Sequence, residues 1–253
     1  MNDSCLQSPI LARIRGVSHG FSTRLGGVST GAYASLDLTP GAPEANRRQF
    51  AATIGLGDPH AFVEVNQVHG TTVLDAEDAE GADADGLVTA RAGVAVGVRT
   101  ADCAPVLIAA VDRKLAPIAV AAVHAGWRGA TAGILRVAVE ALLEKGVAPS
   151  RLFFAIGPAI SKLHFEVGPE VVEAARASLD GDAPPVGTSP KNTPHLDLVE
   201  LLVMQLERLG IERRQVDVAG ACTFQDESRF YSHRRDRGVT GRHLSAIYIE
   251  KNS

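Results

Sequence analysis

The chain has 253 residues, a formal net charge of −4, 45% hydrophobic residues and 21% charged residues. This composition is ordinary for a soluble globular protein and gives no reason to expect a nucleic-acid or membrane-surface partner. Three cysteines are few and odd in number, which favours a reducing compartment over a disulfide framework. The first ten residues show no signal-peptide pattern and no apolar run approaches about 18 residues, so we expect a cytoplasmic protein.

Short β-branched runs bounded by turn residues predict most of the strands. In chain order they are AFVEV (61–65), TTVL (71–74), GLVT (86–89), VAVGV (94–98), APVLIAAV (104–111), PIAVAAVH (117–124), LFFAI (152–156) and LSAIYIE (244–250). Apolar residues at helical spacing predict helices over 130–145 and 196–209, and a weaker helix over 169–178. The Pro- and Gly-rich stretch 180–194 predicts a long surface loop. Since strands occur both in consecutive runs and around helices, we expect an α+β fold with mixed sheets.

The two apolar strands on either side of DRKL predict a buried hairpin with reactive groups at its open end. If Asp112 and Leu115 close a two-residue loop, Cys103 faces His124 across the ladder. His69, in NQVHG, follows another strand and is a third candidate. One cysteine and two histidines can supply three ligands of a tetrahedral zinc ion, which leaves the fourth position open for catalysis. The same donor set can also accept copper.

Seven motifs occur in order along the chain: GGVSTGAYASLDL, NQVHG, DADGLVT, TADCAPVLI, AAVHAGWRG, AIGPAIS…FEVG and FYSHRRD…TGR. Together they resemble the YfiH/YlmD-type family, also called laccase-domain or polyphenol oxidase family proteins, over residues 20–249. The resemblance implies a single domain over 1–253 with four layers in the order α/β/β/α. It also implies metal ligands at His69, Cys103 and His124. One departure is Asp37 in SLDL, where the family usually has Asn.

The activity implied by this resemblance is zinc-dependent phosphorolysis of adenosine, inosine, guanosine and methylthioadenosine, with hydrolytic deamination of adenosine beside it. Asp102 is then a candidate for general acid–base catalysis next to the three metal ligands. Arginines are suited to bind phosphate, and carboxylates and amides to bind the nucleoside. The expected substrate-binding residues are Asn66, Gln67, Asp83, Asp85, Arg128, Arg234 and Arg242.

Three other functions stay open at this level. Cys103 could be a thiolate nucleophile activated by His124, as in a hydrolase or amidase that acts on a cell-wall precursor. A copper-dependent polyphenol oxidase has less support, because a multicopper centre needs paired histidines and none of the eight histidines is spaced as His-x-His. A non-catalytic metal- or nucleotide-binding protein would bind its ligand without turnover. Metal analysis and sensitivity to chelators or iodoacetamide distinguish these functions.

Overall fold

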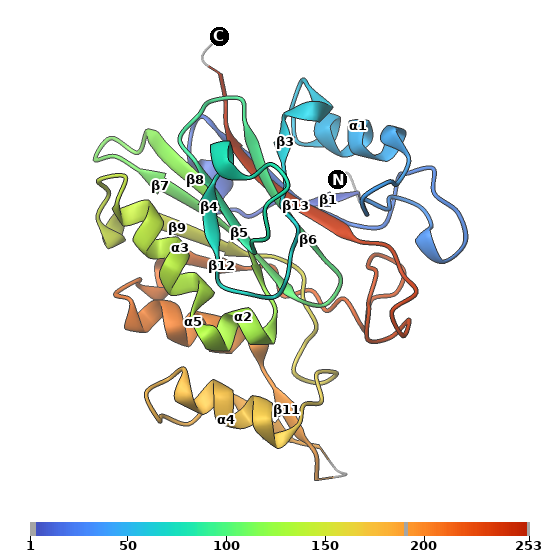
Figure 1. Ribbon diagram of the computed structural model, residues 1–253, viewed down its shortest axis with the longest axis vertical. Helices are drawn as coiled ribbons and strands as arrows, with labels where there is room; N and C mark the ends of the chain where they lie inside the picture. The colour runs from blue at the N-terminus through green and yellow to red at the C-terminus, as the bar shows by residue number, and fades with distance from the viewer. Residues whose placement is uncertain (1–3, 190–191, 252–253) are drawn as a thin grey trace.

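Two stacked β-sheets with helices on both outer faces make up the computed structural model, which describes residues 4–189 and 192–251 (Figure 1). The larger sheet has six strands in the order β12-β9-β7-β8-β5-β4, and the other has five in the order β1-β2-β13-β6-β3. Each sheet contains both parallel and antiparallel pairs. The strands are β1 (Cys5–Leu6), β2 (Val17–Ser22), β3 (Phe62–Val63), β4 (Val73–Asp75), β5 (Gly86–Thr89), β6 (Ala95–Thr100), β7 (Ala104–Val111), β8 (Pro117–Ala125), β9 (Leu152–Ile156), β10 (Val186–Thr188), β11 (Pro194–Leu196), β12 (Val216–Val218) and β13 (His243–Ile249).

The described part of the chain contains five α-helices, which lie outside the two large sheets (Figure 1). They are α1 (Glu44–Thr53), α2 (Trp127–Ala132), α3 (Ile134–Leu143), α4 (Pro169–Ala177) and α5 (Leu198–Arg208). Figure 1 shows α2, α3 and α5 together on one side of the sheets and α1 on the other side. None of the helices in the described part of the chain has the length and apolar character needed to cross a membrane.

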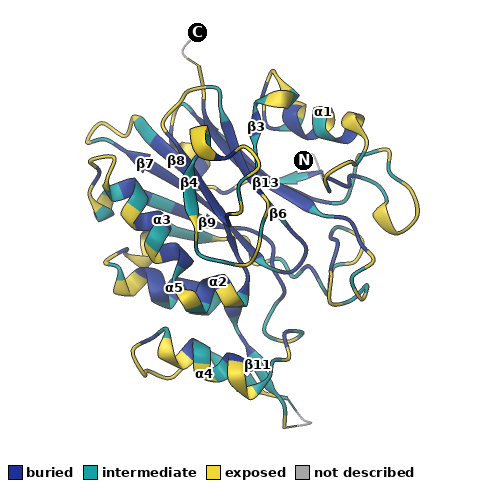
Figure 2. Cartoon of the chain, in the orientation of Figure 1, coloured by how far each residue is buried: buried dark blue, intermediate teal, exposed yellow. Residues whose placement is uncertain are grey.

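Three hydrophobic cores separate the four layers. One lies between the six-stranded sheet and its helices and contains Ile108 and Leu135, and a second lies between the sheets and contains Leu107. The third lies under α1 and contains Phe50. Leu107 and Ile108 are neighbours in β7 but belong to different cores, because successive side chains of a strand point to opposite faces. Figure 2 shows both sheets buried and the exposed residues on the outer sides of the helices. The expected α/β/β/α arrangement is confirmed.

Some elements differ from the sequence-based expectation. The helix expected over 130–145 is two helices, because Gly133 adopts a left-handed conformation with φ of 92° between α2 and α3. The strand expected over 61–65 is only two residues long, as β3. The expected loop 180–194 contains β10 and the first residue of β11, which pair as an antiparallel hairpin; residues 190–191 lie outside the described residues.

The predicted register of the central hairpin is wrong by two residues. In the structure His124 pairs with Pro105, so Cys103 lies directly before the first residue of β7. The turn is longer than two residues because the Asp112 side chain accepts hydrogen bonds from the backbone N–H groups of Lys114 and Ala116. A bulge at the end of β7 shifts the ladder further.

Two buried histidines predict that acid destabilises the fold. Nε2 of His19 accepts a hydrogen bond from the backbone of Ser8 at 2.8 Å, and Nε2 of His243 accepts one from the backbone of Tyr231 at 2.9 Å. Burial lowers the pKa of His19 to about 4 and that of His243 to about 3. An unfolded histidine titrates near 6.5, so the unfolded chain binds more protons below that pH. The stability from these groups is complete above pH 6.5 and is lost as the pH falls toward 4 and then 3.

We expect the free energy of unfolding to fall by roughly 2–4 kcal/mol between pH 7 and pH 5. Urea unfolding with a chelator present measures this difference without a contribution from bound metal. The His243→Gln variant keeps a neutral acceptor and should lose about half of the pH dependence. Equal stabilities at the two pH values would show that these histidines are protonated in the folded protein.

Candidate metal centre

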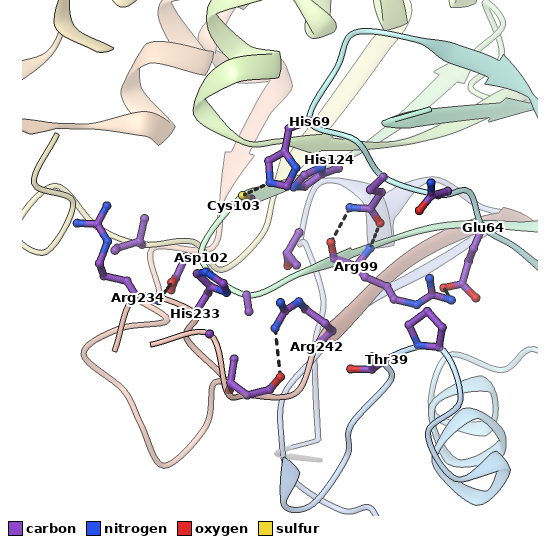
Figure 3. Close-up of a pocket in the computed structure, with 18 of the residues that line it drawn as sticks. Thr39, Glu64, His69, Arg99, Asp102, Cys103, His124, His233, Arg234 and Arg242 are labelled. Atoms are coloured by element: carbon purple, nitrogen blue, oxygen red, sulfur yellow. Dashed lines mark hydrogen bonds and ion pairs between the residues drawn. The ribbon is translucent and has the colours of Figure 1, made fainter. Parts of the chain in front are cut away.

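His69, Cys103 and His124 lie together at one wall of a pocket (Figure 3). Their ligand atoms all lie within 4.8 Å of one another. Sγ of Cys103 is 3.9 Å from Nε2 of His69, and the two imidazole rings are 4.7 Å apart with 83° between their planes. The structure therefore brings together the three side chains that the sequence singled out. Within residues 4–189 and 192–251, no second group of this kind is present.

The backbone places each of the three side chains differently. His124 is the next-to-last residue of β8, and Cys103 directly precedes β7. His69 lies in the loop between β3 and β4 with a left-handed φ of 62°. Gly126 leaves room for the group, because a Cβ there would lie 3.0 Å from the sulfur of Cys103 and 3.1 Å from the His69 ring. Two rigid strand ends and one strained loop thus form the site.

The orientation of His124 is fixed from behind by Asp85. Oδ1 of Asp85 lies 2.7 Å from Nδ1 of His124, and a carboxylate can only accept there, so Nδ1 carries the proton. Nε2 is then left with a lone pair for a metal ion. Burial alone would raise the pKa of Asp85, but the hydrogen bonds from His124 and Gly70 lower it overall. In its neutral form the imidazole is therefore held as the tautomer that binds metal through Nε2.

The interaction between Cys103 and His124 favours the thiolate form of Cys103. Burial would raise the pKa of the Cys103 thiol, but the hydrogen bonds with His124 and His69 outweigh it and lower the pKa to about 6. Burial would lower the pKa of His124, but its bonds with Asp85 and Cys103 raise it to about 9. A thiolate is the form of cysteine that binds metal. One thiolate and two imidazoles fit zinc or copper.

The pocket beside these three side chains has a volume of about 920 Å³. Its apolar lining comes from Val65, Trp127, Ile160, Phe165 and Leu198. Its charged lining comes from Glu64, Arg99, Asp102, Arg234 and Arg242. Figure 3 shows the charged side chains around the side of the pocket that faces the metal-binding group. An apolar wall with a few convergent charged groups is typical of a small-molecule site.

Four of the expected substrate-binding residues line the pocket, namely Asn66, Gln67, Arg234 and Arg242. Both atoms of the Gln67 amide bond to the backbone of Arg99, since Nε2 donates to its carbonyl and Oε1 accepts from its N–H, both at 2.7 Å. Gln67 therefore ties the loop that carries His69 to β6.

The other three lie outside the pocket lining. Asp83 is exposed and accepts a hydrogen bond from Asn66 at 2.6 Å. Arg128 is exposed, and its guanidinium lies 4.4 Å from the centre of the Trp127 ring. Asp85 is fully buried behind His124. Their contacts are with the protein itself.

Asp102, the expected acid–base residue, lies in the pocket wall with its carboxylate held at both oxygens. Oδ1 accepts from the hydroxyl of Thr223 and Oδ2 from the backbone N–H of Arg234, each at 2.7 Å. The backbone of Asp102 has a left-handed φ of 98°. This carboxylate joins the residues just before β7, which include Cys103, to the C-terminal segment that carries Arg234.

Two charged residues of the pocket were missed at the sequence level. Glu64 forms ion pairs with Arg99 at 2.5 Å and with Arg47 at 2.6 Å. A single arginine at the end of the apolar strand VAVGVRT is the signal that could have identified Arg99. His233 also lines the pocket and lies in the FYSHRRD motif, beside the arginine that was singled out.

Asp37, the departure from the family pattern, does not line the pocket. Its Oδ1 accepts hydrogen bonds from the backbone and hydroxyl of Thr39 and from the backbone N–H of Arg242. The carboxylate is buried and holds these two lining residues in place.

Comparison with known proteins gives a consistent result. A family model described as "Multi-copper polyphenol oxidoreductase laccase" matches residues 18–250. A relative from Deinococcus radiodurans named "Purine nucleoside phosphorylase" is 37% identical over 251 residues, which covers 97% of this chain and 93% of the relative. The crystal structure of YlmD from Geobacillus stearothermophilus is 32% identical with a TM-score of 0.87, covering 99% of this chain and 98% of YlmD. The structure of Bacillus licheniformis hypothetical protein YfiH is 28% identical with a TM-score of 0.82, covering 94% of each chain.

Proposed function

Because the chain belongs to the family described as multi-copper polyphenol oxidoreductase laccase, with relatives named purine nucleoside phosphorylase, we propose that it cleaves purine nucleosides with phosphate at a site built around one zinc ion. The proposed substrates are adenosine, inosine, guanosine and methylthioadenosine, and deamination of adenosine is a proposed side reaction. The observation that carries the proposal is the group of His69, Cys103 and His124 in the wall of a pocket that also holds three arginines.

The donor set supports zinc. A thiolate and two imidazoles are common zinc ligands, and three protein ligands leave one position for a reactant. When bound, zinc supplies a Lewis acid that polarises an oxygen atom or lowers the pKa of a water molecule. The residues of the chain hold the ion, orient the substrates and exchange protons with them. Asp102 is the proposed acid–base residue, because it lines the pocket and is the neighbour of Cys103 in the sequence.

The charges of the pocket support an anionic co-substrate. The pocket lining contains three guanidinium groups and two carboxylates. Glu64 is already paired with Arg47 and Arg99, and Asp102 accepts two hydrogen bonds from the protein. The remaining positive charge fits a phosphate ion, which arginine binds with charge-assisted hydrogen bonds. The apolar wall that includes Trp127 and Phe165 fits a purine base.

A single metal ion is supported although the family description mentions several coppers. A multicopper oxidase needs further histidine ligands near the first site. Only His69 and His124, of the eight histidines, join a metal-binding group within the described residues. His19 and His243 are buried and their Nε2 atoms accept backbone hydrogen bonds. The donor set thus supports single-ion chemistry over four-electron oxygen chemistry.

The central prediction of this proposal is phosphate-dependent release of hypoxanthine from inosine. We expect turnover by the zinc-loaded protein, loss of turnover after chelation, and recovery when zinc is added back. The reaction without phosphate is the control, because hydrolysis alone would continue there. Absence of hypoxanthine release by protein that contains one zinc per chain would contradict the proposed activity and leave metal binding without turnover.

A second candidate follows from the side chains behind Cys103. The sulfur, the His124 ring and the Asp85 carboxylate form a chain of partners like that of a cysteine hydrolase, and the pKa of Cys103 is lowered to about 6. This arrangement would suit an amidase that needs no metal. Activity that survives chelation but is blocked by iodoacetamide would favour the hydrolase, whereas zinc bound in equal amount to the chain would favour the phosphorylase.

A further inference from the structure

We infer that Asp85 is a positioning residue that holds both histidine ligands of the proposed zinc ion and thereby sets the affinity of the site for metal. The inference rests on the metal site proposed above and gives Asp85 a different role from the substrate contact that its sequence motif suggested. It depends on the position of one carboxylate between two separate segments of the chain.

The ladder of the six-stranded sheet places Asp85 opposite His124. Gly86, the first residue of β5, pairs with Val123 of β8 in an antiparallel ladder, so Asp85 just before β5 lies opposite His124. The backbone N–H of His124 donates to the carbonyl of Asp85 at 2.7 Å, next to the side-chain contact of 2.7 Å between Nδ1 and Oδ1. Two hydrogen bonds between the same two residues therefore fix the position of the His124 backbone and the orientation of its ring.

The same carboxylate also binds the loop that carries His69. Oδ1 accepts from the backbone N–H of His69 at 2.9 Å, and Oδ2 accepts from those of Val68 at 3.2 Å and Gly70 at 2.6 Å. Three successive N–H groups that converge on one anion form a nest, a turn that an anion stabilises. This contact supports the left-handed conformation of His69, whose φ is 62°. One buried charge thus positions one ligand through its ring and the other through its backbone.

An asparagine at this position has the same shape but the wrong hydrogen-bonding pattern. All four groups that face the two oxygens of Asp85 are donors. The amide nitrogen of Asn must then face either Val68 and Gly70 or His69 and His124, and in each case it meets donors. If it faces His124, the ring can accept at Nδ1 only by moving its proton to Nε2, where that proton blocks the metal ion.

The test compares Asp85→Asn with Asp83→Asn, a matched change two residues away at an exposed carboxylate. Zinc affinity is measured by competition with a chromophoric chelator, and the ligand geometry by the absorption spectrum of the cobalt-substituted protein. We expect Asp85→Asn to bind zinc about 10–100-fold more weakly, as outer partners of metal ligands do, with an altered cobalt spectrum. Asp83→Asn should match the wild type in both. A purely structural role would lower the unfolding midpoint of the metal-free protein and leave the cobalt spectrum unchanged.

Wild-type affinity and spectrum in a folded Asp85→Asn variant would overturn the inference. Nitrogen-15 NMR of the imidazoles in the zinc-loaded wild type gives an answer even if the variant does not fold. We expect a proton on Nδ1 of His124, and coordination through Nδ1 would refute the inference. A wild-type protein that binds no zinc would instead refute the metal site itself, which separates the two failures.

Discussion

Replacement of Cys103 by alanine should abolish zinc binding and lower the rate of nucleoside phosphorolysis more than about 100-fold, a loss beyond that of outer partners of metal ligands. The reason is that Cys103 provides the anionic sulfur of the proposed ligand set, and two neutral imidazoles alone leave zinc with two protein ligands. The fold should be retained, because Cys103 lies before β7 and is not part of the three hydrophobic cores. Metal content, circular dichroism and inosine turnover measure the three expectations.

The matched control for this change is Cys222→Ala. Cys222 is also partly buried, and its sulfur accepts a hydrogen bond from the backbone N–H of Ser161 at 3.3 Å. It does not line the pocket and is not in the metal-binding group. This variant should keep its zinc and its turnover. Full turnover in Cys103→Ala would refute the role of the sulfur in the reaction.

The fold was predictable in its core and less so at its edges. Strands β5, β7 and β9 have the ends expected from the sequence, because they are continuous apolar runs that end at turn residues. Helix α1 was missed, since its sequence EANRRQFAAT offers only a short apolar face, which includes Phe50 and Ala51, for the third core. The break between α2 and α3 depends on the conformation of one glycine, and the pattern of apolar residues continues through it.

The metal-binding group was predicted correctly, but its three side chains meet through contacts other than the predicted cross-strand pair. The sequence predicts that Cys103 pairs with His124 across the ladder, but in the structure Pro105 occupies that position. The three side chains still meet, because Asp85 joins the end of the hairpin to the loop of His69 and Gln67 joins that loop to β6. Such contacts link residues between 16 and 39 positions apart in sequence. A single sequence carries no pattern that reveals them, and the ordered family motifs supplied that information.

Replacement of Arg242 by glutamine should raise the KM for phosphate by roughly 10–150-fold, because hydrogen bonds to a charged group contribute about 1.5–3 kcal/mol. The three arginines of the pocket are not equivalent. Arg99 is paired with Glu64 at 2.5 Å, and Arg234 donates to the carbonyl of Glu166 and lies over Phe165. Arg242 has no carboxylate partner within the described residues, and Nη1 donates only to the carbonyls of two neighbouring residues. It is therefore the guanidinium with the most capacity left for an anion.

Steady-state kinetics with phosphate and inosine varied in turn separate this role from a general loss of the site. A phosphate ligand predicts a higher KM for phosphate, a nearly unchanged KM for inosine and wild-type zinc content, since Arg242 does not touch the metal-binding group. The control is Arg237→Gln, an exposed arginine in the same segment that does not line the pocket. If Arg242→Gln raised only the KM for inosine, the positive side of the pocket would bind the nucleoside, and phosphate would have to approach from Arg234. The phosphate and the nucleoside would then have exchanged places in the pocket, so this variant decides which of the two substrates lies beside Arg242.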